Sequence, residues 1–291
     1  MSSTNRVLEG KIAIVTGASR GAYHVILCVP LLTTFLSGIG AGICENLASK
    51  GCSLIANYTS ESSASKTEAM AKQLQELYGV NVLPVQADMG SENGPAHIVQ
   101  KALSHFANPD TRKLQIDIVI NNAGLASNLT IDACNSEDFA KLYNVNVRGP
   151  LFLMKAVMPY LPGDRSGRIV NVSSVSASCG FPAQSVYGGT KAALEAMTRT
   201  WARELAERAT VNAVNPGPVA TDMWDSVTPE FEKGISTWNQ NTPLSTWRDG
   251  VDKPELKESA KRAGGRPVSQ QKGELSSSLI FTRRTSRTLQ V

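Results

Sequence analysis

KIAIVTGASRG, residues 11–21, is the stretch that most clearly indicates the fold of this 291-residue chain. Its first six residues form a short apolar run, typical of a strand that a parallel sheet buries on both faces. Gly17 follows at once, and Gly38-Ile39-Gly40 opens the next expected helix. Glycines allow a backbone to approach a pyrophosphate, and a helix N-terminus offers free N–H groups. The two parts together predict a glycine-rich phosphate turn, although any strand-to-helix turn favours glycine.

Downstream of this turn, short apolar runs alternate with segments of helical spacing. We expect strands at residues 11–16, 53–57, 80–85, 116–120, 168–172 and 210–214, and helices at 39–50, 62–78, 94–105, 137–161 and 186–206. Strands that alternate with helices imply right-handed βαβ units. The sequence therefore predicts an α/β fold, a single Rossmann-type doubly wound parallel sheet flanked by helices, in one domain over residues 1–265.

Two stretches depart from this pattern. Residues 22–37 (AYHVILCVPLLTTFLS) are an uncharged, apolar insertion after the first strand. With 16 residues and an internal Pro30, the insertion is short for a membrane span of about 20 residues. Residues 266–291 form an atypical basic tail, which we expect to be poorly ordered. They stand where a seventh strand would be expected, so the last strand is predicted to be missing or altered.

The charge and the cysteines exclude several classes of protein. The chain has a net charge of +4, all of it due to the tail, which argues against a nucleic-acid surface. The five cysteines show no CxxC spacing and the three histidines show no metal-ligand spacing. Because the N-terminus does not resemble a signal peptide, we expect a cytoplasmic protein with reduced thiols, no bound metal and no membrane attachment.

Candidate chemistry lies at the expected ends of the strands and on the last helix. Asn121-Asn122-Ala123-Gly124 follows the fourth strand, at the edge where doubly wound sheets bind ligands. Tyr187 and Lys191 are four residues apart and share one face of their expected helix. A free tyrosine has a pKa of about 10, and a close ammonium group lowers it toward the range useful for acid–base work. Ser174 ends the fifth strand, where its hydroxyl would bond a substrate oxygen. On spacing alone, an ordinary amphipathic helix and an ordinary turn remain open explanations.

The motifs taken together resemble the classical short-chain dehydrogenase/reductase family. They occur in the family's order over about residues 10–267, with the insertion excepted: TGASRG…GIG, NNAG, YNVNVRG, IVNVSS, YGGTK and NPGPVATDM. Within the family, the chain is most similar to fungal members related to 3-oxoacyl-carrier-protein reductases and secondary-metabolism ketoreductases. The resemblance implies a small-molecule carbonyl or alcohol substrate and a homodimer or homotetramer.

The resemblance also implies a role for each catalytic candidate. Tyr187 would be the general acid in reduction and the base in oxidation. Lys191 would hold the nicotinamide ribose and depress the pKa of Tyr187, while Ser174 would orient the carbonyl oxygen. Asn146 would kink its helix and hold a water molecule that relays protons to Lys191.

A larger set of residues is implied in cofactor binding. Asp88 would reach the adenine, Asn122 and Gly124 would line the adenosine side, and Pro216, Gly217 and Thr221 would flank the nicotinamide. The full predicted set is Gly17, Ser19, Arg20, Gly21, Ile39, Gly40, Asn57, Tyr58, Thr59, Asp88, Asn122, Ala123, Gly124, Tyr187, Lys191, Pro216, Gly217, Val219 and Thr221.

The second strand favours NADP(H) over NAD(H). An NAD site usually carries an acid at the end of this strand, against the ribose 2′-hydroxyl. Here the strand ends in Asn57-Tyr58-Thr59-Ser60, with no acid before Glu61. Arg20, in the phosphate turn, would pair with a 2′-phosphate. We therefore expect an NADP(H)-dependent oxidoreductase that interconverts a ketone and a secondary alcohol of polyketide, terpenoid or related secondary metabolism.

Two other hypotheses remain open. The insertion either bulges out, with Gly17 and Gly40 near their usual places, or disturbs the cofactor site by displacing Arg20 or by blocking the adenosine pocket. In the second case the chain would be a folded but catalytically impaired relative of the family. The third hypothesis is a protein anchored to a membrane through residues 22–37. Substrate determinants are expected in residues 223–263, whose three tryptophans suggest an apolar, ring-shaped substrate or simply the packing of a helical lobe.

Overall fold

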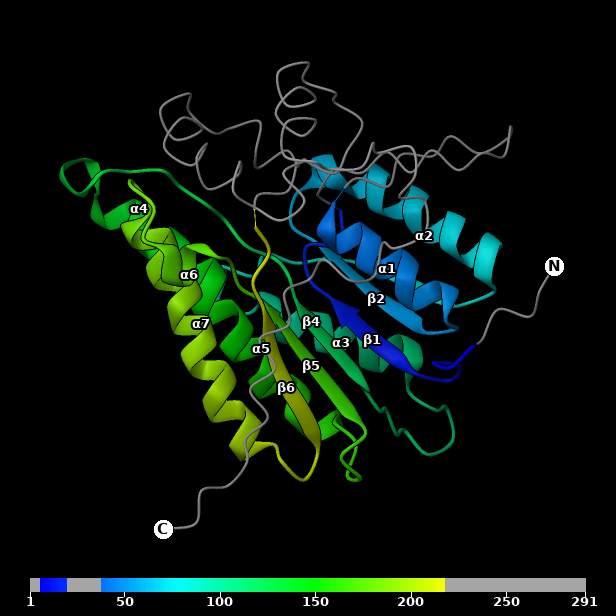
Figure 1. The fold of residues 1–291 in the computed structure, drawn as a ribbon. Coiled ribbons are helices and arrows are strands. Elements are labelled where there is room, and N and C mark those ends of the chain that lie inside the picture. The colour runs from blue at the N-terminus through cyan, green and yellow to red at the C-terminus, as the bar shows by residue number, and fades with distance from the viewer. Residues whose placement is uncertain (1–5, 20–37, 218–291) are drawn as a thin grey trace, which may run out of the picture.

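The sheet is parallel and doubly wound, as expected (Figure 1). The computed structural model describes residues 6–19 and 38–217. In this part of the chain, six strands follow the order β3-β2-β1-β4-β5-β6. Their bounds are β1 (Ile12–Val15), β2 (Ser53–Tyr58), β3 (Val82–Gln86), β4 (Ile118–Asn121), β5 (Gly167–Val172) and β6 (Ala209–Val214). β1 pairs with both β2 and β4, so the chain reverses its winding direction at β1, and the ligand edge is expected there.

The helices connect successive strands. They are α1 (Ile39–Ser49), α2 (Ala64–Tyr78), α3 (Gly94–Phe106), α4 (Ser136–Tyr143), α5 (Gly149–Val157), α6 (Ser176–Cys179) and α7 (Ser185–Glu204). Single 3₁₀ turns cover Glu61–Ser63, Ile131–Ala133 and Met158–Tyr160. The predicted strands, and the predicted helices other than 137–161, begin and end within two residues of the observed ones.

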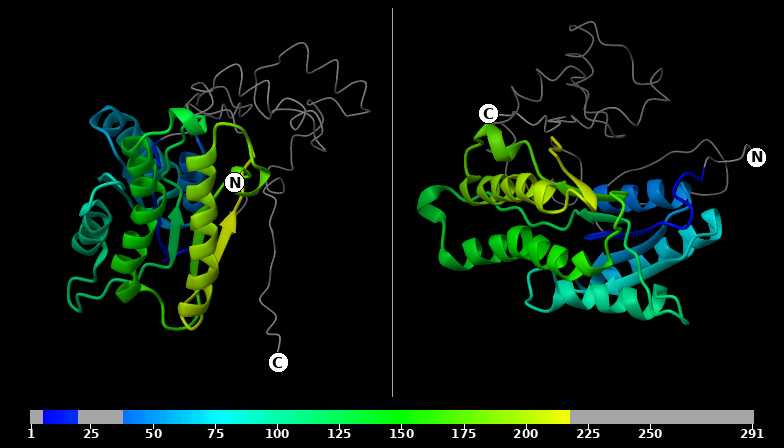
Figure 2. Two further views of the ribbon diagram at one scale, coloured as in Figure 1. Left: turned by 90° about the vertical axis from the view of Figure 1, so that its left-hand side faces the viewer. Right: turned by 90° about the horizontal axis from the view of Figure 1, so that it is seen from below.

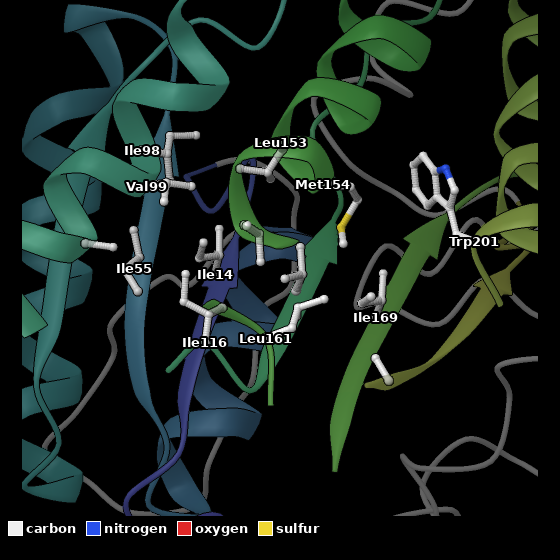
Figure 3. Close-up of a cluster of buried hydrophobic side chains, with 14 of the residues drawn as sticks. Ile14, Ile55, Ile98, Val99, Ile116, Leu153, Met154, Leu161, Ile169 and Trp201 are labelled. Carbon is white, nitrogen blue, oxygen red and sulfur yellow. The ribbon is translucent and has the colours of Figure 1, made fainter. Parts of the chain in front are cut away.

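Two apolar layers hold the helices on the sheet. Because side chains alternate along a strand, Ile14 of β1 faces one side while Ala13 and Val15 face the other. The first layer joins the sheet to α3, α5 and α7, and contains Ile14, Ile98, Leu153 and Trp201 (Figure 3). The second joins it to α1 and α2 through residues such as Cys44 and Leu74. Figure 2 shows α3, α5 and α7 arranged along their face of the sheet.

The helix predicted over residues 137–161 is observed as one helical run over residues 136–160, with a π-helical break near its middle. The structure divides this segment into α4, a π-helical turn at Asn144–Arg148, α5 and a 3₁₀ turn. Pro150 lacks the N–H that would ordinarily bond the carbonyl of Asn146, and the N–H of Gly149 instead reaches back to the carbonyl of Asn144. The break therefore lies at Asn146, where the resemblance implied a kink.

Several sequence predictions lie outside the described residues. They are the insertion at 22–37, the altered last strand, the limit of the domain at residue 265 and the basic tail at 266–291. Among the described residues, no helix combines the length and the apolar character needed to cross a bilayer.

Candidate active site

The two halves of the predicted phosphate turn lie in contact. A Cβ at Gly40 would overlap the carbonyl oxygen of Gly17 and lie 2.7 Å from Asn122 Nδ2. A Cβ at Gly17 would lie 2.9 Å from the Cα of Ala123, and Gly17 has a φ of 64° that favours glycine. The residues on the two sides of the segment 20–37 therefore lie side by side. Ser19, which is half-buried, and Ile39 border the same turn. Arg20 and Gly21 lie outside the described residues.

Hydrogen bonds from β4 fix this turn. Thr16 Oγ1 donates to the carbonyl of Ile120 and accepts from the backbone N–H groups of Asn122 and Ala123 at 3.0 Å each. The Asn122 amide donates to the carbonyl oxygens of Thr16 (2.8 Å) and Gly17 (3.1 Å). The NNAG motif thus locks the loop after β1 against the loop after β4.

The end of β2 lies beside the turn, and its asparagine holds the backbone. Asn57 is fully buried. Its Oδ1 accepts from the N–H of Gly17 at 3.3 Å, and its Nδ2 donates to the carbonyls of Tyr58, Val85 and Ala87. Because the whole amide bonds protein groups, Asn57 connects β2, β3 and the turn.

Two carboxylates act on the end of β2: Glu61, already noted in the sequence, and Glu68, which lies further along the chain in α2. Thr59 is exposed and Tyr58 is buried. Burial raises the pKa of Tyr58, and the charges of Glu68 and Glu61 raise it further. Asp88, exposed after β3, accepts a hydrogen bond from the N–H of Gly90 at 2.8 Å.

The four predicted catalytic side chains lie together at the carboxyl edge of the sheet. Their exposed fractions are 9% for Tyr187 and Ser174, 4% for Lys191 and 1% for Asn146. Tyr187 and Lys191 lie one turn apart on α7, and Lys191 Nζ is 5.8 Å from the centre of the Tyr187 ring. Lys191 and Asn146 both lie close to Gly124, since a Cβ there would lie 3.3 Å from Lys191 Nζ and 3.4 Å from Asn146 Oδ1.

Burial is the main influence on the pKa values of Tyr187 and Lys191. Burial raises the pKa of Tyr187, and its hydrogen bond with Ser174 lowers that pKa by a smaller amount. Burial also lowers the pKa of Lys191 to about 8, and its ammonium donates to the carbonyl of Val172 at 2.8 Å. Desolvation therefore dominates the pKa of Tyr187, and the ammonium of Lys191 is directed to Val172; that Lys191 lowers the pKa of Tyr187 stays a prediction.

Asn146 is held on three sides. Its Oδ1 accepts from the N–H of Leu125 at 2.8 Å, and its Nδ2 donates to the carbonyl of Leu125 (2.8 Å) and to Thr190 Oγ1 (3.0 Å). Thr190 in turn donates to the carbonyl of Tyr187 at 2.7 Å. Asn146 thus ties the loop after β4 to the catalytic face of α7.

A polar network that sequence reasoning missed extends from Ser174. Ser174 Oγ donates to Ser176 Oγ (3.2 Å), Ser176 Oγ donates to Gln184 Oε1 (2.6 Å), and Gln184 Nε2 donates to Asn128 Oδ1 (2.9 Å). Ser176 and Gln184 also line a cavity of about 400 Å³ beside α6 and the start of α7. The two serines at 174 and 176 were a signal in the sequence, but their pairing with Asn128 depends on the tertiary fold.

The loop after β6 closes the edge. The carbonyl of Pro216 accepts from the N–H of Val175 at 3.2 Å, which brings Pro216 and the exposed Gly217 next to the serine loop. Val219 and Thr221 lie outside the described residues, where the tryptophan-containing lobe also lies. Within the described residues, no group of His, Cys, Asp and Glu is arranged to hold a metal ion.

Comparisons with known proteins agree with this geometry. A model of the short chain dehydrogenase family matches residues 29–232. L-xylulose reductase from Aspergillus niger is 48% identical over 269 residues, which are 89% of this chain and 84% of the relative. L-xylo-3-hexulose reductase from Hypocrea jecorina is 44% identical over 270 residues, 89% of this chain and 81% of the relative. Among solved structures, a blue fluorescent protein from a metagenomic library, in complex with NADPH, is similar with a TM-score of 0.69 and 28% sequence identity. The superposition covers 87% of this chain and 90% of the chain of that protein.

Proposed function

The chain belongs to the short-chain dehydrogenase/reductase family, oxidoreductases that interconvert carbonyl and alcohol groups, and on that premise we propose that it reduces a small polyhydroxy ketone with NADPH. The observation that carries this proposal is the meeting of Tyr187, Ser174, Lys191 and Asn146 at the carboxyl edge of the sheet, beside a glycine turn.

The turn fits a dinucleotide. Gly17 and Gly40 leave no Cβ between the two backbones, and the first turn of α1 carries no acidic residue. The N–H groups and the positive end of the α1 dipole would therefore suit a pyrophosphate. The N–H groups of the first turn of α1 would hold the phosphates, which Gly17 and Gly40 let approach closely, Asn122 would line the adenosine side, and Lys191 would hold the nicotinamide ribose. When bound, NADPH supplies the hydride for the ketone carbon.

The protein's own residues supply the proton. A tyrosine hydroxyl, with an ordinary pKa of about 10, carries its proton near neutral pH and can donate it to the developing alkoxide, which is a much stronger base. Ser174, in hydrogen-bond contact with Tyr187, would turn its hydroxyl toward the same oxygen and orient the carbonyl. Lys191, one turn away, would stabilise the phenolate that remains after the proton has moved.

Hydrogen-bonding groups near the reacting position favour a hydroxylated substrate. Ser176, Gln184 and Asn128 extend from Ser174. These groups bond one another, and a substrate hydroxyl would add a further hydrogen bond to the series, whereas an apolar ring would cover it without adding one. The two fungal relatives are named for ketose reduction, which supports the same class. A ketone of secondary metabolism, expected from the motifs, is the second candidate.

A panel assay tests the proposal. The full chain is incubated with NADPH or NADH and with L-xylulose, L-xylo-3-hexulose or a polycyclic aromatic ketone, and the loss of reduced cofactor is followed. We expect kcat/KM to be highest for a ketose with NADPH. Preference for the aromatic ketone would replace the ketose assignment, and absence of turnover with every ketone would overturn the proposal.

A further inference from the structure

Three segments that carry proposed site residues meet at the carboxylate of Glu195. Glu195 lies on α7, one turn after Lys191, and is half-buried. Its Oε1 accepts hydrogen bonds from Ser173 Oγ at 2.9 Å and from Asn215 Nδ2 at 2.7 Å. Ser173 follows β5 and Asn215 follows β6. One side-chain oxygen atom on α7, Glu195 Oε1, therefore connects the residues that follow two strands, β5 and β6.

Each of the two donors adjoins a residue proposed to act in the reaction. Ser173 precedes Ser174, and Asn215 precedes Pro216 and Gly217. Two backbone bonds support the same junction, from the N–H of Ser173 to the carbonyl of Val214 and from the N–H of Val175 to the carbonyl of Pro216. A displacement at Glu195 would thus be transmitted to the serine loop and to the loop after β6 together.

The chemistry of the contact suits a carboxylate. Both partners are neutral donors, and an ionised carboxylate accepts hydrogen bonds without offering a competing proton. No Lys or Arg of the described residues lies within salt-bridge distance of Glu195. Within the described residues, a salt bridge therefore does not account for the position of the Glu195 carboxylate.

We propose that Glu195 is a positioning residue that aligns the loops after β5 and β6 with the Tyr187–Lys191 face of α7. The inference rests on the proposed function, since it assigns Glu195 to the same site. Glu195 itself touches neither substrate nor cofactor in this account. Its effect is to hold Ser174 and the Pro216-Gly217 segment at the separation that hydride and proton transfer require.

Two substitutions separate this role from general stability. Glu195→Gln keeps an acceptor oxygen for both donors, whereas Glu195→Leu removes both hydrogen bonds at similar size. We expect Glu195→Leu to lower kcat/KM by about tenfold or more and to raise the primary deuterium isotope effect measured with labelled NADPH. Glu195→Gln should stay within about threefold of the parent chain. Glu204→Leu, an exposed position on the same helix, is the matched control and should change neither quantity.

A readout that needs no turnover keeps the test independent of the proposed function. Hydrogen exchange in the peptides that contain residues 173–176 and 215–217 should accelerate in Glu195→Leu but not in Glu204→Leu. Accelerated exchange in Glu195→Leu, alongside a parent chain that reduces no ketone, would retain the positioning role and overturn only the proposed function. Unchanged exchange and an unchanged isotope effect in Glu195→Leu would overturn the inference. A loss of kcat/KM in Glu195→Gln as large as that in Glu195→Leu would also overturn it. So would a Glu195→Leu variant whose Tm falls and whose activity falls only in proportion to the amount of folded protein.

Discussion

Gly40 contacts Gly17 so closely that a Cβ at Gly40 would overlap the carbonyl oxygen of Gly17. The two residues lie on opposite sides of residues 20–37, and the contact rebuilds the phosphate turn from separated pieces of chain. Both glycines thus lie where the first of the two arrangements has them, while the course of the insertion itself lies outside the described residues. Whether Arg20 reaches a 2′-phosphate stays a prediction.

The first prediction follows from this contact. Gly40→Ala should weaken NADPH binding by about tenfold or more and destabilise the fold, because the added methyl group forces the turn open. A Cβ at Gly42, two residues along α1, would meet no neighbouring group within 4 Å. Gly42→Ala is therefore the control, and it should leave binding unchanged and add about 0.5–1 kcal/mol to helix stability. Fluorescence titration with NADPH and thermal unfolding measure both effects. Equal binding by the two variants would show that the close contact is not needed for the cofactor.

The second prediction concerns cofactor choice. Thr59→Asp should shift kcat/KM toward NADH, because a carboxylate at the exposed end of β2 repels a 2′-phosphate and accepts a bond from a 2′-hydroxyl. Glu61→Gln should shift the preference the other way, since Glu61 is one of the two carboxylates whose charge acts on Tyr58. The ratio of kcat/KM for the two cofactors measures both changes. An unchanged ratio in both variants would place the phosphate-discriminating groups elsewhere.

The third prediction concerns Asn146. Asn146→Ala removes three hydrogen bonds at a buried position and leaves the partner groups of Leu125 unpaired. We expect a loss of about 1–3 kcal/mol in unfolding free energy, together with a lower kcat because the loop after β4 is no longer fixed against α7. Urea unfolding and steady-state kinetics give the two values. A variant with normal stability and normal kcat would show that Asn146 fixes neither the loop nor the helix.

The fourth prediction is a dependence of stability on pH. Burial lowers the pKa of Lys191 to about 8 in the folded chain, below about 10.4 when unfolded. Between these values the unfolded chain binds the extra proton, so the free energy of unfolding rises with pH. Below pH 8 the cost of charging buried Lys191 is present in full, at about 3 kcal/mol.

Lys191→Met removes that titration. Its unfolding free energy, minus that of the parent chain, should therefore fall as the pH rises from about 8 to about 10.5. Unfolding in urea across this range, without cofactor, measures the difference. A difference that does not change with pH would mean that Lys191 titrates alike in both states.

The spacing of residues along the sequence was sufficient to predict the features that depend on neighbours in the chain. The spacing of Tyr187 and Lys191 placed both on one helical face, and the apolar runs predicted each of the six described strands. Contacts between distant segments were beyond this reasoning. Lys191, for example, is directed to the carbonyl of Val172 in β5.

The network that joins Ser176, Gln184 and Asn128 depends on the same kind of contact. It brings together the loop after β4, the segment after β5 and the start of α7, and no spacing in the sequence indicates which side chains will pair. The burial that raises the pKa of Tyr187 likewise depends on the folded chain.

The most direct test of the central claim compares the parent chain with Tyr187→Phe in NADPH-dependent reduction of L-xylulose, alongside NADPH titration of both. Phenylalanine keeps the aromatic ring at this position of α7 and removes only the hydroxyl proposed as the acid. The account predicts that kcat falls by about a hundredfold or more while the Kd for NADPH changes by less than about threefold. A Tyr187→Phe variant that keeps the parent kcat would contradict the assignment of Tyr187 as the acid and, with it, the proposed mechanism.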